Sequence, residues 1–218
     1  MRRDAIAGVV PAYPVYLFDV DGTLLDSAAD ICGAIAQVLE RNGAPPQPYE
    51  FLKSYVGLHL NALFGEVFPD AGPERLEELL QEYRTTYWGR GHAATTVFPG
   101  VAEALGSLGG RKSTATTKGT PTTRLVLEKF GLIRHFDHVQ GTDGFPSKPA
   151  PDVIQAALAA LGARPEECLM VGDSPADMEA GRAAGVKTCA VLYGYGQPEA
   201  MARFEPDYWI EDLRALAG

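Results

Sequence analysis

One short stretch near the N-terminus organises this chain: Val15-Tyr16-Leu17-Phe18-Asp19-Val20-Asp21-Gly22-Thr23. Its first four residues are apolar without alternation, which is typical of a parallel strand covered by helices on both faces. Asp19 and Asp21 follow two positions apart, so their side chains share one side of an extended backbone. Gly22 then lets a ligand approach the backbone without meeting a Cβ. Because ligands of open α/β sheets bind at the carboxyl ends of strands, the stretch predicts one wall of a functional site.

The second half of the chain alternates between strand and helix patterns. Strands are expected near residues 113–116, 136–140, 168–171, 186–191 and 208–210, with single helices between them and a last helix at the C-terminus. Such alternation predicts an α/β fold with a Rossmann-like, doubly wound parallel sheet.

The region after the first strand has a different character. Between residues 26 and 95 the chain shows helical periodicity and no convincing strand, with Asp26 or Ser27 placed to cap the first helix. We therefore predict an all-helical cap domain, residues 27–95, inserted into an α/β core formed by residues 1–26 and 96–218. Hinges are expected near residues 25–27 and 98–100.

Composition restricts the class of protein. A chain of 218 residues with 46% hydrophobic content can form one core and a smaller appendage. A net charge of -9 without a basic stripe argues against nucleic acid as a partner. The apolar run at residues 5–10 is too short to span a membrane, and the three separated cysteines indicate buried apolar positions. We expect a soluble, cytoplasmic protein with no membrane partner, either a monomer or a homodimer.

Polar residues follow three of the later strands, as they follow the first. They are Thr116-Thr117-Lys118, Lys148 before Pro149, and Gly172-Asp173-Ser174-x-x-Asp177. In a parallel sheet these strand ends would converge on one crevice. Each residue also has an ordinary alternative: Asp173 and Asp177 could favour a helix start through its dipole, and Lys118 is expected to be solvated. The combination indicates a site more strongly than any one residue.

These ordered motifs, from Asp19-x-Asp21-Gly22-Thr23 to Asp177, resemble the haloacid dehalogenase superfamily of phosphohydrolases. The resemblance covers nearly the whole chain, and the helical insertion looks like the C1 cap of the phosphoglycolate phosphatase-like branch. One departure is Thr117, since members of this branch often carry Thr-Asn-Lys where this chain has Thr-Thr-Lys. The phosphate-binding hydroxyl is kept, so the reaction class is expected to be unchanged.

The resemblance implies a Mg²⁺-dependent phosphatase for a small phosphate monoester. Asp19 would be the nucleophile that forms an aspartyl phosphate, and Asp21 would protonate the leaving oxygen and then deprotonate water. Thr116, Thr117 and Lys148 would bind the phosphate. Asp19, the backbone carbonyl of Asp21, and Asp173 would hold Mg²⁺, with Asp177 a ligand or a neighbour of one. The cation and Lys148 are needed because a carboxylate ~4 Å from a phosphate meets roughly 4 kcal/mol of repulsion per charge pair.

Substrate selectivity is expected to lie in the insertion. Lys53, Gly57 and His59 belong to a loop that resembles the glycine-bearing specificity loop of C1 caps. By resemblance 2-phosphoglycolate is the leading substrate, while pyrophosphate, sugar phosphates and nucleotide monophosphates stay open. Two other functions also stay open: a phosphosugar mutase of the β-phosphoglucomutase type, and a catalytically silent binding module. Asp21 argues against a dehalogenase or a phosphonatase, which lack this acid.

Overall fold

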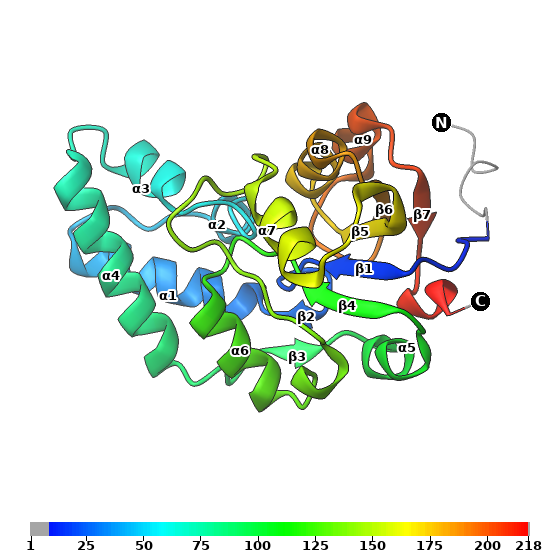
Figure 1. The fold of residues 1–218 in the computed structure, drawn as a ribbon. Coiled ribbons are helices and arrows are strands. Elements are labelled where there is room, and N and C mark those ends of the chain that lie inside the picture. The colour runs from blue at the N-terminus through cyan, green and yellow to red at the C-terminus, as the bar shows by residue number, and fades with distance from the viewer. Residues whose placement is uncertain (1–8, 218) are drawn as a thin grey trace.

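The computed structural model describes residues 9–217 (Figure 1). Its strands are β1 (Val15–Phe18), β2 (Leu25–Asp26), β3 (Thr96–Val97), β4 (Arg111–Thr114), β5 (Cys168–Gly172), β6 (Lys187–Val191) and β7 (Tyr208–Ile210). Its α-helices are α1 (Ala28–Arg41), α2 (Tyr49–Lys53), α3 (Asn61–Val67), α4 (Pro73–Gly89), α5 (Val101–Ser107), α6 (Thr120–Lys129), α7 (Asp152–Leu161), α8 (Pro175–Ala184) and α9 (Pro198–Met201). No helix within these residues has the length and apolar character that crossing a membrane requires.

Five strands form a parallel sheet in the order β4-β1-β5-β6-β7. Tyr16 and Phe18 of β1 pack on the face that α5 and α6 cover, whereas Val15 and Leu17 pack against α7 and α8 on the other face (Figure 1). This burial on both sides explains the unbroken apolar run of β1. The predicted Rossmann-like, doubly wound sheet is confirmed.

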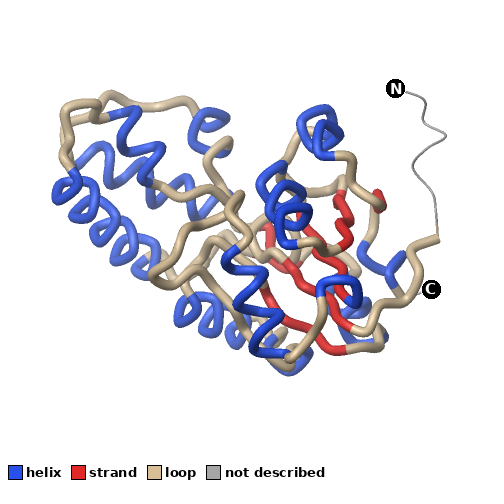
Figure 2. Tube along the Cα trace, turned by 45° about the horizontal axis from the view of Figure 1, so that its top comes forward, coloured by secondary structure: helices blue, strands red, loops and turns tan. Residues whose placement is uncertain are grey.

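Helices α1–α4, called the insert below, pack around a hydrophobic cluster of their own. Figure 2 shows them gathered at one end of the molecule, with the strands towards the other. The chain enters and leaves the insert through β2 and β3, which pair antiparallel with Leu25 opposite Val97. The two expected hinge segments therefore lie side by side. The domain boundaries at residues 27 and 95 stay a prediction.

The prediction of a strand at residues 136–140 is wrong. Only isolated bridges form there, between Ser113 and His138 and between Thr116 and Gly141. The reason is competition from side chains. The Asp137 carboxylate accepts a hydrogen bond from the backbone N–H of Lys112 at 2.8 Å, and the Thr114 hydroxyl accepts from that of Gln140 at 2.8 Å. Side-chain oxygens thus occupy main-chain donors that a continuous ladder would use.

Two smaller expectations also differ from the structure. The second strand of the sheet, expected at residues 113–116, is Arg111–Thr114 and so starts and ends two residues earlier. The expected C-terminal helix is a short 3₁₀ turn, Leu213–Leu216, whose two terminal leucines are buried in the core. β4 therefore ends two residues before Thr116, and the 3₁₀ turn carries none of the polar motifs.

Candidate active site

Asp19 lies directly after β1, where its backbone N–H donates to the carbonyl of Val171 in β5 at 2.9 Å. Its carboxylate accepts a hydrogen bond from the Lys148 ammonium at 2.8 Å. Lys148 comes from the loop before α7 and is 1% exposed, and it also donates to the Ala115 carbonyl at 2.9 Å and to Asp177. The ends of β1 and β4 and this loop therefore meet at one buried ammonium group.

Asp173 and Asp177 follow β5 and complete a group of buried acids. Ligand oxygens of Asp19, Asp173 and Asp177 all lie within 4.8 Å of one another. Asp177 also serves the start of α8, because its carboxylate accepts from the backbone N–H and the hydroxyl of Ser174 at 3.0 and 2.7 Å. We call Asp19, Lys148, Asp173 and Asp177 the carboxylate–lysine cluster.

Asp173 is held from two sides. Its carboxylate accepts from the Thr23 hydroxyl at 3.0 Å and from the backbone N–H of Tyr195 at 2.8 Å. Gly22 lies against it with a φ of +93°, and a Cβ at this position would come within 2.2 Å of the Asp173 carboxylate. The glycine of the opening motif is therefore required both by backbone conformation and by space.

The cluster carries more negative charge than Lys148 alone can balance. Burial raises the pKa of Asp19 to about 6, with Lys148 opposing and Asp177 adding to the shift. Burial, followed by repulsion from Asp177 and Asp19, raises the pKa of Asp173 to about 8. Three close carboxylates with unbalanced charge fit a hard divalent cation, which prefers oxygen ligands.

Asp21 has different surroundings. The Ser27 hydroxyl donates to one of its oxygens at 2.6 Å, and the Lys118 ammonium lies 3.0 Å from the other. Ser27 occupies the N-cap position of α1, but its side chain makes no capping hydrogen bond. Instead the Tyr195 hydroxyl accepts from the backbone N–H groups of Ser27 and Ala28 at 2.7 and 3.0 Å. Ser27 thus stands at an expected cap position, but the side-chain cap is not made, because the Ser27 hydroxyl donates to Asp21 and the Asp26 carboxylate accepts from Tyr195.

The expectation that Lys118 is solvated is also wrong. Its side chain is 9% exposed and donates to the Tyr87 hydroxyl of α4 at 3.2 Å, with the ammonium 4.5 Å from the centre of that ring. Burial alone would lower the pKa of Lys118, but Asp21 and then Tyr87 raise it above its usual value. Lys118 thus links the second acid of the opening motif to the insert.

Thr116 and Thr117 lie beside Lys118 at the end of β4. The Thr116 hydroxyl is buried and accepts from the backbone N–H of Lys118 at 3.4 Å. The Thr117 hydroxyl is also buried, and no residue between 9 and 217 gives it a hydrogen-bond partner. Buried polar atoms are normally paired, so this hydroxyl is available to a ligand.

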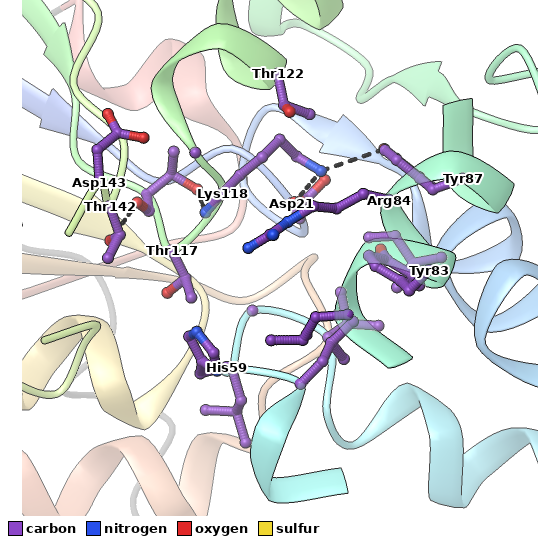
Figure 3. A pocket seen from close by; sticks show the side chains of 18 of the residues that line it. Asp21, His59, Tyr83, Arg84, Tyr87, Thr117, Lys118, Thr122, Thr142 and Asp143 are labelled. Carbon is purple, nitrogen blue, oxygen red and sulfur yellow. Dashed lines mark hydrogen bonds and ion pairs between the residues drawn. The ribbon is translucent and has the colours of Figure 1, made fainter. Parts of the chain in front are cut away.

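Asp21, Thr116 and Thr117 face a cavity of about 590 Å³ between the sheet and the insert (Figure 3). Gly57 and His59 also line it, as do Arg84 and several aromatic side chains of α4. Lys53 does not: it lines a second cavity of about 360 Å³ with Asp173 and Tyr195, and its ammonium lies 5.2 Å from the centre of the Tyr195 ring. The residues of the expected specificity loop therefore line two different cavities.

Sequence reasoning missed three residues of this site: Ser27, Lys118 and Tyr195. The position of Lys118 directly after Thr116-Thr117 was a usable signal. No local sequence signal points to Ser27 or Tyr195, because they contact each other although 168 residues separate them in the chain.

Comparison with known proteins adds independent findings. The family profile described as haloacid dehalogenase-like hydrolase matches residues 16–191. Phosphoglycolate phosphatase 1 of Pseudomonas aeruginosa is 34% identical over 210 residues, covering 92% of this chain and 77% of that protein. Tyrosine-protein kinase PtkA of Mycobacterium tuberculosis is 35% identical over 204 residues, covering 91% and 68%. A haloacid dehalogenase-like hydrolase structure from Streptococcus pneumoniae superposes with a TM-score of 0.84 at 26% identity, covering 92% and 95%. These relatives of nearly equal identity thus carry the names of a phosphatase and of a kinase.

Proposed function

Because the chain belongs to the haloacid dehalogenase-like hydrolase family, we propose that it hydrolyses a small phosphate monoester with the help of Mg²⁺. One observation carries the proposal. The two acids of the opening motif each contact a buried lysine but differ in their other neighbours: Asp19 lies with Asp173 and Asp177, whereas Asp21 lines the cavity and accepts from Ser27. Two carboxylates in such different environments suit two different chemical tasks.

In the first step, a carboxylate oxygen of Asp19 attacks phosphorus and the bond from phosphorus to the ester oxygen breaks. The phosphoryl group is then an acyl phosphate on Asp19, and the departing oxygen takes a proton from Asp21 to leave as an alcohol. Lys148, the hydroxyls of Thr116 and Thr117, and nearby backbone N–H groups would orient the phosphoryl oxygens.

In the second step, Asp21 accepts a proton from water, and the resulting hydroxide attacks the acyl phosphate. The bond between phosphorus and Asp19 breaks, inorganic phosphate leaves, and both acids return to their starting forms. The overall reaction consumes one ester and one water and yields one alcohol and one phosphate. A single group thus acts first as acid and then as base.

Asp19, the backbone carbonyl of Asp21, and Asp173 would hold Mg²⁺, with Asp177 beside them. When bound, the ion would offset the negative charge of the substrate phosphate and of the carboxylates. The substrate we place first is 2-phosphoglycolate, because several similar proteins are named phosphoglycolate phosphatase.

The test is phosphate release from a panel of phosphate monoesters, including a chromogenic aryl phosphate, in the presence of Mg²⁺. We expect turnover by the wild-type protein and a loss on the order of 10⁴-fold in kcat for Asp19→Asn. Asp70→Asn is the matched control, since Asp70 is exposed on the insert and lines neither cavity. If the protein released no phosphate from any ester, or if Asp19→Asn retained full activity, the proposal would be wrong.

A further inference from the structure

The charges around the main cavity do not balance locally. Its basic side chains are His59, Arg84 and Lys118, and its acids are Asp21 and Asp143. Lys118 is paired with Asp21, and Asp143 accepts from the backbone N–H of Thr120 at 3.0 Å. Arg84 also lines the cavity, but within the described part of the chain no acid that lines the cavity pairs with it.

The contact that Arg84 does make is weak. Its guanidinium lies 3.1 Å from Glu77, one of the residues of α4 outside the cavity. The two side chains are 51% and 57% exposed, and ion pairs with this exposure contribute little to stability. Figure 3 shows the Arg84 side chain extending from α4 into the cavity. The guanidinium can therefore exchange Glu77 for a ligand at small cost.

A hydrogen-bond donor accompanies Arg84 on the cavity wall. Partial desolvation, and then the charge of Arg84, lower the pKa of His59, which favours the uncharged ring. Its Nδ1 accepts from the backbone N–H of Asn61 at 3.3 Å, which assigns the proton to Nε2. The Arg84 guanidinium and this ring N–H together favour an anionic ligand group.

That group differs from the phosphate that reacts. The reacting phosphorus must lie within bonding reach of Asp19, which is held at the sheet by Lys148 and Val171. Arg84 belongs to α4 of the insert and lines the main cavity, whereas Asp19 is not among the residues that line it. An arginine fork can bind a carboxylate or a phosphate through two parallel hydrogen bonds, which gives selectivity as well as affinity.

We infer that Arg84 binds a second anionic group on the substrate, so that the preferred esters carry a carboxylate or a second phosphate on the leaving group. The inference rests on the proposed phosphatase function. It replaces Lys53 by Arg84 as the principal cation that determines selectivity.

The experiment compares substrates that differ only at this second group. The acidic ester is 2-phosphoglycolate. The ester called neutral below is 2-hydroxyethyl phosphate, which keeps the phosphate but carries an uncharged hydroxymethyl group in place of the carboxylate. We expect wild-type kcat/KM to favour the acid by roughly ten- to hundredfold, the effect of one charge-assisted contact, mainly through KM. In Arg84→Met, kcat/KM for 2-phosphoglycolate should fall to the level of the neutral ester, while the neutral ester stays within about twofold of wild type.

Two further variants and one substrate complete the design. Arg84→Lys should keep part of the preference, because a lysine retains the charge and loses the fork. Arg75→Met is the matched control: Arg75 is also exposed on α4 and pairs with Glu78 outside the cavity, so both substrates should behave as with wild type. The bisphosphate of ethylene glycol tests which anion Arg84 prefers. Of this ester and 2-phosphoglycolate, the one whose kcat/KM falls more in Arg84→Met carries the preferred anionic group.

The outcomes separate this inference from the proposed function. If Arg84→Met lowered kcat/KM of the acidic and the neutral ester equally, or if wild type did not distinguish them, the inference would be overturned while the phosphatase activity stood. Failure of the wild-type protein to hydrolyse any ester would remove the proposed function and this inference with it.

Discussion

The carboxylate–lysine cluster and the insert wall of the cavity hold their charges in opposite ways. In the cluster, Lys148 is 1% exposed and bonds to two carboxylates and a backbone carbonyl. On the insert wall, His59 and Arg84 are exposed, with one backbone contact and one weak ion pair respectively. A buried charged residue with several partners cannot be substituted without loss of stability, whereas an exposed one can. The same contrast separates the residues proposed for the chemistry from those proposed for selectivity.

The largest effect should come from Lys148→Met. Removing one partner of a buried ionic group leaves the others uncompensated, so we expect the free energy of unfolding to fall by about 3–5 kcal/mol. Turnover should be lost as well. Urea unfolding of this variant is compared with that of Arg84→Met, which should stay within about 0.5 kcal/mol of wild type. Equal costs for the two variants would contradict the contrast between the regions.

Removal of the proposed Mg²⁺ should be the next largest change. We expect a chelator to abolish turnover, and Mg²⁺ at about a hundred times its Kd to stabilise the fold by about 2.7 kcal/mol. Asp173→Asn should lose most of this stabilisation, because it removes one of three clustered carboxylates. Thermal unfolding with and without Mg²⁺ measures both effects, and Asp70→Asn should respond as wild type does. An unchanged Mg²⁺ response in Asp173→Asn would place the ion elsewhere.

Lys118 links Asp21 to α4 of the insert, so its removal should have an intermediate effect. In Lys118→Met, Asp21 keeps its hydrogen bond from Ser27 but loses its ion pair and its link to α4. We expect kcat/KM to fall roughly tenfold, because small misplacements of a proton-transfer group slow the reaction. Tyr87→Phe keeps the ring beneath the ammonium and should lose less. A larger loss in Tyr87→Phe than in Lys118→Met would show that α4, rather than the lysine, holds Asp21.

The smallest effects belong to the loop of the insert. His59 lines the main cavity and Lys53 does not, so we expect His59→Ala to lower kcat/KM a few-fold and Lys53→Ala to change it less than about twofold. The measurement uses the same ester panel as above. The reverse order would restore Lys53 as the principal contact.

The sequence was informative where the signal is local. The two-residue spacing of Asp19 and Asp21 and the parallel strand pattern together predict the fold and the placement of polar residues at one end of the sheet. The signal failed where a distant residue decides the outcome. Lys118 is buried because Asp21 and Tyr87 are brought to it, and residues 136–140 are no strand because side chains of Asp137 and Thr114 compete for backbone donors.

The Tyr195 hydroxyl has a consequence for protein engineering. The backbone N–H groups of Ser27 and Ala28 at the start of α1 donate to the hydroxyl of Tyr195, which lies in the loop after β6. The insert therefore does not carry its own helix cap. Grafting residues 27–95 onto another core would leave α1 uncapped unless the recipient offers a hydroxyl at the same place. We expect such a chimera to be less stable by about 1 kcal/mol than one that receives the tyrosine as well. Exchange of substrate preference between such proteins would therefore need two segments transferred together.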